Sequence, residues 1–303
     1  MGHKNKEILT RQIEKEYKSM IAFGESKHEA KRSDEGIKDK IYSRSTLKSY
    51  MAHANYFAEY CKENFNCKTL EQCRSHVDDW LRYREEQGMS AYTLKLEASS
   101  LAKLYHCSTK DFVQTKARSR SDITRSRNEV ENDKHFNEEK HKDFVDFCRS
   151  CGLRREELEH LKGWQLRENF YGDGKDYIYI GKDDGPKGGR SRLVPIIGNV
   201  DHVKYLMKEA GPERVFEKVP SHADIHSYRS DYATKMYNDL ARDIKDIPYD
   251  KVNKGTGRKY QGDVYHCRGD YKGIKLDKLA MKEVSNALGH ERLEVVAGHY
   301  IRL

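Results

Sequence analysis

The stretch NALGHERLEVVAGHYIRL (residues 286–303) places a tyrosine, Tyr300, three residues before the last residue of the sequence. Ten residues before it stands His290, within the tripeptide Leu-Gly-His. Chain ends fray unless something holds them, so this is an unusual place for an aromatic core residue. A tyrosine hydroxyl can act as a nucleophile and a histidine can move protons. The stretch therefore raises the question of what chemistry His290 and Tyr300 serve.

Composition limits the classes of protein that need to be considered. The chain has 303 residues, 35% of them charged, and a formal net charge of +8. Its mean hydropathy is −0.97, and no apolar run approaches the length of a membrane span. The first thirty residues lack the apolar centre of a signal peptide, and seven cysteines form no disulfide-like framework. We expect a reduced, cytoplasmic, nucleoid-associated protein with no membrane contact and a polyanionic partner.

The N-terminal half reads as helical. Residues 5–32 combine many charges with sparse apolar positions, which predicts a solvated helix in an N-terminal extension over residues 1–40. From there to residue 115, apolar residues recur at steps of three and four, as amphipathic helices require. They include Leu47, Tyr50, Met51, Ala54, Phe57, Cys61, Val77, Trp80, Leu81, Leu94, Ala98, Leu101 and Tyr105. Residues 41–115 are therefore predicted to form a compact helical domain.

A basic segment follows over residues 116–134. Its first part, KARSRSDITRSRN (residues 116–128), has almost no apolar side chains. It reads either as a solvated connector or as a linker that lies along a phosphate backbone and gains affinity through counterion release. The candidate DNA-binding residues are Lys116, Arg118, Arg120, Arg125 and Arg127, with Arg190 further along the chain.

The pattern changes again over residues 135–303. Two helices are predicted to meet at Gly152, and the β-rich runs DYIYI (176–180) and SRLVPI (191–196) flank a Gly/Pro-rich turn, which predicts a β-hairpin. Helices are predicted near residues 200–210, 224–242 and 277–288. Residues 246–276 hold five glycines and many charges, so they read as a long, partly ordered loop.

Four short motifs in this region carry residues that could perform chemistry. CGLRREELEHL contains Arg154 and, one turn later, Glu157; GPKGGRSRLVP contains Lys187 at the tip of the hairpin. Taken alone, the first reads as a surface ion pair and the second as a solvated turn lysine. DIHSYRSDYA places His226 and Arg229 on one helical face, a spacing that most often marks an exposed pair. The fourth motif holds the histidine and tyrosine of the terminal stretch.

Taken together and in this order, the motifs resemble the active-site set of the tyrosine recombinase (phage integrase) family. GLRREEL is similar to that family's first arginine box, KGGRSRLVP to its β-hairpin lysine box, HSYR to its His-x-x-Arg box and LGH…HY to its terminal box. The resemblance covers residues 136–303 well. It implies a mainly α-helical, two-domain DNA clamp: a helical core-binding domain, the basic linker and a catalytic domain with a small β-hairpin or sheet.

The resemblance also implies roles for the matched residues. Tyr300 would attack a DNA phosphate and form a covalent phosphotyrosine. Arg154 and Arg229 would hold the nonbridging oxygens with their planar guanidinium groups. Lys187 would protonate the leaving 5′ oxygen, which Lys182 and Lys175 could do in its place.

The remaining roles belong to histidines and one carboxylate. His226 would accept or return the tyrosine proton, and His290 would hydrogen-bond the phosphate. The spacing from His290 to the tyrosine is one residue longer than the family's usual spacing, which leaves His299 as an alternative at the phosphate. Glu157 would orient the neighbouring arginine and histidine.

The expected function is site-specific DNA recombination or integration of a mobile element, without cofactor or metal. Cys148 and Cys151 form a lone CxxC with no second pair, so buried packing is the expected role of these thiols. The partners would be double-stranded DNA, three further copies of the chain on paired sites, and an accessory directionality factor. The alternatives are a type IB topoisomerase-like enzyme and a non-catalytic DNA-binding protein with the same fold.

Overall fold

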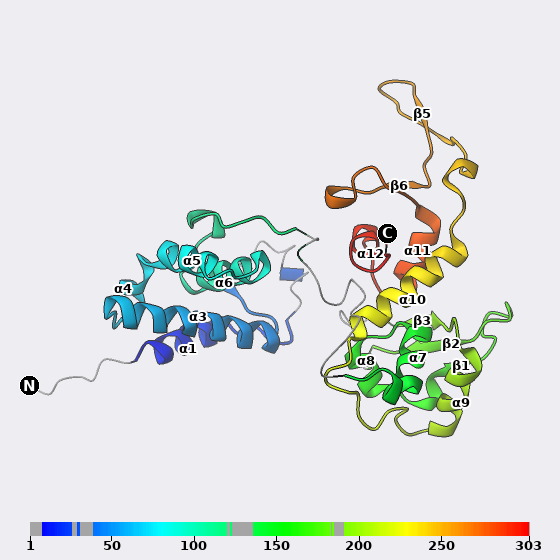
Figure 1. The fold of residues 1–303 in the computed structure, drawn as a ribbon, viewed down its shortest axis with the longest axis horizontal. Coiled ribbons are helices and arrows are strands. Elements are labelled where there is room, and N and C mark those ends of the chain that lie inside the picture. Colours follow the sequence, from blue (N-terminus) through cyan, green and yellow to red (C-terminus); the bar gives the residue numbers. More distant parts are fainter. Residues whose placement is uncertain are drawn as a thin grey trace, which may run out of the picture. The chain divides into compact units, whose positions relative to one another are not determined.

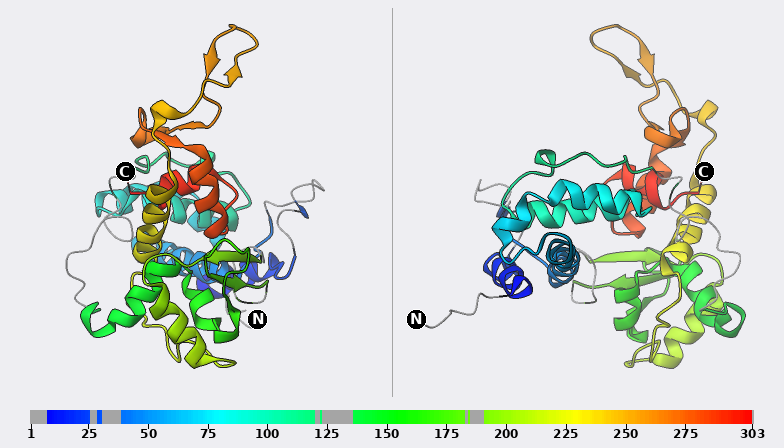
Figure 2. Two further views of the ribbon diagram at one scale, coloured as in Figure 1. Left: turned by 90° about the vertical axis from the view of Figure 1, so that its right-hand side faces the viewer. Right: turned by 60° about the vertical axis from the view of Figure 1, so that its left-hand side comes forward.

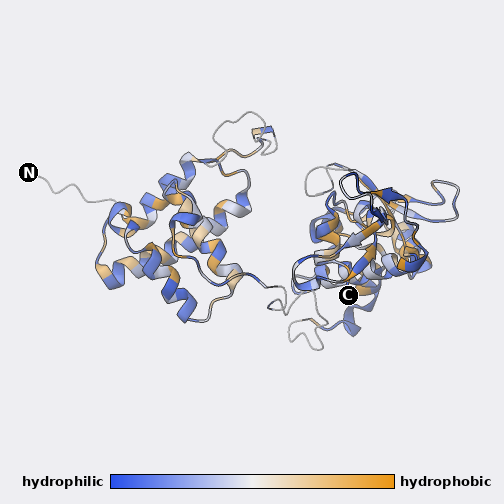
Figure 3. Ribbon diagram, turned by 90° about the horizontal axis from the view of Figure 1, so that it is seen from above, coloured by the Kyte–Doolittle hydropathy of each residue, from blue (hydrophilic) through white to orange (hydrophobic). Residues whose placement is uncertain are grey.

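The computed structural model describes residues 8–25, 29–30, 39–119, 122, 136–182, 184 and 191–302. The chain forms two compact units, Met1–Asp122 and Ile123–Leu303, which we call unit 1 and unit 2 (Figure 1). Hydrophobic residues gather inside each unit (Figure 3), and the two buried cores share no residue. The prediction of a mainly helical chain with small antiparallel sheets is confirmed. No described helix is long and apolar enough to cross a membrane.

Unit 1 is built from helices. They are α1 (Leu9–Ser19), α3 (Arg44–Phe65), α4 (Leu70–Arg74), α5 (Val77–Glu86), α6 (Ala91–Leu104) and the 3-10 turn η2 (Thr109–Asp111). Local sequence sets the boundaries: the Ser43 hydroxyl accepts a hydrogen bond from Thr46 N, and Ser90 does the same for Thr93 N. Phe57, Leu81 and Leu101 are fully buried where α3, α5 and α6 meet.

The first helix differs from its prediction as a solvated segment. Ile13 and Tyr17 of α1 are fully buried against the core of unit 1. The Tyr17 hydroxyl donates a hydrogen bond of 2.8 Å to the Ser100 carbonyl oxygen in α6. One narrow apolar stripe is enough to dock a helix whose other faces are charged, and that is why composition alone suggested solvation.

Unit 2 combines a small sheet with seven helical or 3-10 segments around it that position the site. These are η3 (Glu139–His141), α7 (Lys142–Cys151), α8 (Arg155–His160), η4 (Gly163–Gln165), α9 (Val200–Ala210), α10 (Ile225–Leu240) and α11 (Lys278–Ala287). The helix α12 (Leu293–His299) follows α11, and η5 (Ile244–Asp246) and η6 (Gly269–Tyr271) lie in the segment between α10 and α11.

The sheet contains the predicted hairpin. Strands β1 (Leu166–Arg167), β2 (Tyr177–Ile180) and β3 (Arg192–Pro195) pair antiparallel in the order β1-β2-β3, with Ile178 opposite Val194. Ile178 and Ile180 are fully buried, so this face of the sheet joins the core with α7, α9 and α10. The predicted helices near residues 200–210, 224–242 and 277–288 are α9, α10 and α11.

Gly152 joins α7 to α8, as predicted. Its backbone has φ +58°, a left-handed conformation that glycine adopts without a Cβ penalty. A Cβ at this position would lie 2.3 Å from Tyr232 Cδ1 of α10. The turn therefore needs glycine both for its backbone angle and for the close approach of α10.

The segment between α10 and α11 corrects the prediction of a long, partly ordered loop. It contains two short antiparallel ladders, β4 (Lys251–Val252) with β5 (Lys259–Tyr260), and β6 (Val264–His266) with β7 (Lys275–Asp277). The first ladder projects from unit 2 as a hairpin (Figure 2). Strands of two or three residues carry too little alternation to be recognised in a sequence.

Candidate active site

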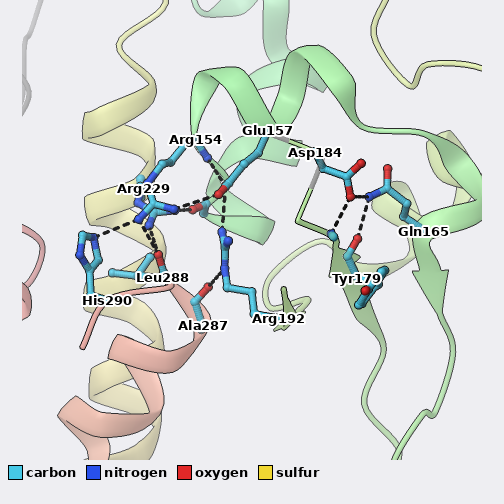
Figure 4. Close-up of polar contacts among 12 residues, drawn as sticks. Arg154, Glu157, Gln165, Tyr179, Asp184, Arg192, Arg229, Ala287, Leu288 and His290 are labelled. Atoms are coloured by element: carbon cyan, nitrogen blue, oxygen red, sulfur yellow. Dashed lines mark hydrogen bonds and ion pairs between the residues drawn. The ribbon is translucent and has the colours of Figure 1, made fainter. Parts of the chain in front are cut away.

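Four segments of unit 2 bring most of the sequence-predicted residues together. Arg154 is the N-cap of α8, Arg229 lies in α10, His290 follows α11, and Tyr300 directly follows α12. Arg154, Glu157, Arg229 and His290 are drawn in Figure 4, which shows them converging around the C-terminal end of α11. Residues more than a hundred positions apart in the chain thus form one cluster.

Arg229 is the most deeply buried arginine of the cluster, with 1% of its surface exposed. Its Nη1 donates to the Gly152 carbonyl oxygen and its Nη2 to the Leu288 carbonyl oxygen. Its Nε has no hydrogen-bond partner among the described residues. Burial, together with the positive charge of Arg154, lowers its pKa to about 10. The guanidinium is still charged at neutral pH, and its Nε–H is a donor that has no acceptor among the described residues.

Arg154 is held by a carboxylate and a carbonyl. Its Nη1 donates to Glu157 Oε1 at 2.9 Å and its Nη2 to the Leu288 carbonyl oxygen at 2.9 Å. The same Nη2 lies 3.4 Å from His290 Nε2. The Leu288 carbonyl oxygen therefore joins the two arginines, and the backbone after α11 fixes the distance between them.

Glu157 is fully buried and ionised. Burial alone would raise its pKa, but the hydrogen bond from Arg192 and the charges of Arg192 and Arg229 lower it to about 2. Its Oε2 accepts hydrogen bonds of 2.8 Å from Arg192 Nη2 and from Arg154 N. The expected surface ion pair is thus a buried brace, in line with the orienting role given to Glu157.

Arg192 is a member of this network that the sequence analysis missed. It begins β3, is 8% exposed in its side chain, and also donates from Nε to the Ala287 carbonyl oxygen at 2.8 Å (Figure 4). It therefore ties the hairpin strand to Glu157 and to the end of α11. The sequence signal was its place at the start of a strand that leads out of the lysine box.

Tyr300 is 6% exposed and packs inside the cluster. Its ring centroid lies 5.2 Å from Arg229 Cζ, 5.1 Å from the centroid of the His290 ring and 6.4 Å from that of the His226 ring. Arg302, two residues after Tyr300, pairs with Asp231 of α10 at 2.7 Å. This contact holds the segment after α12 against the rest of unit 2. The residues after Tyr300 are therefore anchored, whereas chain ends without such contacts fray.

The three histidines differ in their surroundings. His226 is exposed in the first turn of α10, and His299 is exposed at the end of α12. His290 is half-buried and is the one whose ring nitrogen lies next to Arg154. The geometry therefore brings His290 to Arg154.

Several predicted residues fall elsewhere. Lys187, Arg190, Arg120, Arg125 and Arg127 lie outside the described residues. Both alternative lysines, Lys182 and Lys175, are exposed. The start of the hairpin turn is fixed by Gln165, whose Nε2 donates to Asp184 Oδ2 at 2.8 Å and to the Tyr179 carbonyl oxygen at 2.7 Å (Figure 4).

The described part of the basic segment belongs to unit 1. The Arg118 guanidinium lies 5.6 Å from the centroid of the Tyr92 ring of α6, and Lys116 N donates to Glu85 Oε1 at 2.7 Å. Both side chains are exposed. The segment thus leaves unit 1 along its surface with its cationic groups still accessible.

The cluster has the chemical groups for handling an oxyanion. Three guanidinium groups, those of Arg154, Arg192 and Arg229, surround one carboxylate, that of Glu157, so positive charge is in excess. Within the described ranges, no group of three or more His, Cys, Asp or Glu side chains is arranged to hold a metal ion. A phenol next to an arginine and a histidine can supply a nucleophile and charge stabilisation at one phosphate.

Comparisons with solved structures return a transposon integrase and a recombinase. Two structures of the Tn1549 transposon integrase, in complex with transposon right end DNA and with a circular intermediate DNA, are each 12% identical to this chain. Their TM-scores are 0.44 and 0.48, with 98% and 97% of this chain and 96% and 95% of theirs covered. XerA recombinase is 13% identical, with a TM-score of 0.31 over 97% of this chain and 94% of its own. At such low identities and TM-scores this likeness carries no conclusion about activity.

The comparison with protein families is more direct. No curated protein matches the chain. The family model described as the phage integrase N-terminal SAM-like domain matches residues 35–110, which contain α3, α4, α5 and α6 of unit 1. Residues 35–110 are thus similar to the phage integrase N-terminal SAM-like domain, and this match is independent of the C-terminal motifs that resemble the same family.

Proposed function

We propose that this protein is a site-specific DNA recombinase that cleaves and rejoins DNA through Tyr300, for the integration or excision of a mobile element. The observation that carries the proposal is the cluster of Arg154, Arg229, His290 and Tyr300 within unit 2. The phage integrase SAM-like domain in unit 1 is a second, independent support. The DNA-bound state of the Tn1549 integrase structures agrees with duplex DNA as the partner.

In the proposed reaction the Tyr300 hydroxyl attacks the phosphorus of one strand. A 3′-phosphotyrosine bond forms, the bond from phosphorus to the 5′ oxygen breaks, and that oxygen leaves with a proton as a hydroxyl group. The phosphodiester energy is stored in the new bond, so neither a metal nor a nucleotide is required. A 5′ hydroxyl from another strand then reverses the step and completes the exchange.

Each neighbouring side chain has a task in this scheme. Arg154 and Arg229 stabilise the charge that develops on the phosphate, a contribution of which one preorganised donor typically supplies a factor of about 10² to 10³ in rate. His290 donates a hydrogen bond to the same phosphate, and the exposed His226 takes the tyrosine proton. Lys187 protonates the leaving oxygen. Glu157, with Arg192, keeps Arg154 in place.

The basic segment is proposed to follow the DNA backbone. Lys116, Arg118, Arg120, Arg125, Arg127 and Arg190 are the residues assigned to phosphate contacts. With residues 1–40 as an extension, 41–115 as core-binding domain and 135–303 as catalytic domain, the chain would clamp a duplex. Four copies would act on two paired sites in the nucleoid, with an accessory factor setting direction.

A covalent-adduct assay tests the proposal. Labelled duplexes from the ends of the element that encodes this chain, nicked near candidate sites to trap the intermediate, are mixed with wild type or Tyr300→Phe without divalent metal. We expect a protein–DNA band on a denaturing gel with wild type only. The variant should bind the same DNA with unchanged affinity, because the ring and its packing against Arg229 are retained.

The outcomes separate the alternatives. An adduct that persists with Tyr300→Phe would refute the assignment of the nucleophile. Binding without any adduct would favour a non-catalytic DNA-binding protein. Relaxation of a supercoiled plasmid without a specific site would instead identify a topoisomerase of type IB.

A further inference from the structure

A hairpin between α10 and α11 has no task in the scheme above. We call residues 249–260 the arm; they contain β4, β5 and the turn that joins them, and every one of them is exposed. Figure 1 shows the arm standing out from the rest of unit 2. Tyr249, Val252 and Tyr260 are 65%, 54% and 49% exposed, which is high for aromatic and β-branched side chains. An exposed ribbon of this kind does not contribute to the core of unit 2 and does not stabilise the fold.

The arm is fixed at its base. Gln261 Nε2 donates hydrogen bonds of 2.7 Å to the carbonyl oxygens of Ile244 and Ile247, and Ile247 is buried. Asp250 Oδ1 accepts a 2.8 Å hydrogen bond from Gly262 N. These bonds set the direction in which the ribbon leaves unit 2, as expected of a surface that must meet a partner.

A second clamp closes the whole segment between the two helices. Arg242, after α10, donates from Nε to Asp277 Oδ2 at 2.7 Å and from Nη2 to Asp277 Oδ1 at 2.8 Å. Asp277 is itself 1% exposed and caps α11 through Leu279 N. The two-pronged pair joins the beginning and the end of the insertion, so the arm is mounted on α10 and α11, the helices that carry Arg229 and lead to His290.

The arm carries an excess of positive charge. Lys251, Lys254, Arg258 and Lys259 face a single acidic residue, Asp250, whose carboxylate is already bonded to backbone. None of the four cations forms an ion pair with a carboxylate of the described residues. Lysine is depleted in protein–protein interfaces, whereas lysine and arginine supply most contacts to DNA phosphates. The composition therefore favours nucleic acid over a second protein as the partner.

We propose that the arm is a second DNA-binding surface of unit 2, which contacts the phosphates of a duplex through Lys251, Lys254, Arg258 and Lys259. A two-stranded ribbon has the width that the major groove of DNA admits, so the strands can lie between the phosphate rows that the cations reach. The inference rests on the proposed function for its partner, duplex DNA, but not on strand cleavage.

Salt dependence of DNA binding tests the proposal. A 40-base-pair duplex of mixed sequence is titrated with full-length wild type and with the K251A/K254A/R258A/K259A variant between about 50 and 200 mM salt, the range over which phosphate contacts change affinity strongly. Each lost contact lowers the slope of log K against log salt by about 0.9. We expect a slope smaller by about 2 to 3.5 and at least about tenfold weaker binding.

A matched control removes the same charge elsewhere in unit 2. The variant K140A/K142A/K208A/K218A changes four exposed lysines on η3, α7, α9 and the stretch after α9, outside the arm and the candidate active site. Its slope should stay within one contact of wild type. Because all substituted side chains are exposed, both variants should show the thermal unfolding midpoint of wild type.

The results separate this proposal from the proposed function. A smaller slope for the arm variant alone supports the arm, even if wild type never forms a covalent adduct. An unchanged slope, or an equal loss in the control, overturns it. An unchanged slope with loss of higher-order complexes on paired DNA sites overturns it too, and assigns the arm to contact between copies of the chain.

Discussion

At the scale of single residues, the candidate site depends on one carboxylate. Glu157 is the acceptor for Arg154 and Arg192, and its pKa of about 2 lies below its ordinary value of 4.5. A buried carboxylate with two guanidinium partners is strongly coupled to them, so removing it leaves two arginines without their acceptor. The arrangement of the cluster is therefore tied to the ionisation of Glu157.

This coupling predicts how stability depends on pH. Because the pKa is lower in the folded state, the ionised carboxylate stabilises the fold fully above pH 4.5, and the stabilisation is lost as pH falls toward 2. The fully buried side chain makes the contribution about 3 kcal/mol. Urea unfolding from pH 6 to pH 3 should show about 2 kcal/mol of this loss in wild type and not in Glu157→Gln.

Glu159→Gln is the control for that series, because Glu159 lies on the same helix with its side chain exposed. It should follow the pH dependence of wild type. If Glu157→Gln also followed it, the carboxylate would not be the group that links the site to stability.

The residue scale also shows where sequence reasoning stopped. Arg154, Glu157, Arg229, His290 and Tyr300 could be selected because their motifs occur in a fixed order. The two arginines of GGRSRLVP could not be ranked from sequence, since Arg190 and Arg192 have the same charge and similar neighbours. In the structure Arg192 pairs with Ile180 in the strand register, and its side chain reaches Glu157.

At the scale of elements, the turns that join the helices do more to position the candidate site than the helices themselves. The turn at Gly152 ends α7, begins the approach to α8, and offers its carbonyl oxygen to Arg229. Periodicity and a Gly/Pro-rich turn were enough to predict α7, α8 and the β2–β3 hairpin. They could not predict the β4–β5 ladder, whose strands are short and charged on both faces.

Substitution of Gly152, which joins α7 to α8, should destabilise the fold. Gly152→Ala places a methyl group 2.3 Å from Tyr232 Cδ1 in a left-handed backbone conformation, and should lower the free energy of unfolding by about 2–4 kcal/mol. Gly172→Ala is the matched control, with φ +70° and no atom within 4 Å. It should cost only about 1–2 kcal/mol of backbone strain. Equal losses in urea unfolding would mean that contact with Tyr232 is unimportant.

At the scale of the whole molecule, the chain is two units with separate cores. The change in composition after residue 115 predicts a separate linker and a second domain, and the two units divide between Asp122 and Ile123. What composition could not show is that α1 belongs to the core of unit 1, because only three buried side chains, Leu9, Ile13 and Tyr17, attach it. Because the neighbouring positions of α1 are charged, so short an apolar stripe is not recognised from composition.

Fragments of unit 1 test this assignment. Residues 8–119 should unfold cooperatively in urea without unit 2. A fragment of residues 41–119 lacks Ile13 and Tyr17, each contributing about 1.5–3 kcal/mol when buried, and should be less stable by several kcal/mol. Circular dichroism at matched concentrations measures both. Identical urea midpoints for the two fragments would mean that α1 is a solvated extension and not part of the core of unit 1.

The excess of guanidinium groups over carboxylates in the cluster has a thermodynamic consequence. Three buried or half-buried cations repel one another around a single anion, and the lowered pKa of Arg229 records that repulsion together with its burial. An oxyanion that enters the cluster relieves it, and anything that binds only the folded state shifts the folding equilibrium toward that state. The chain should therefore have a higher free energy of unfolding when its substrate is bound than in free solution. The negative charge of the substrate would offset the excess positive charge of the three guanidinium groups.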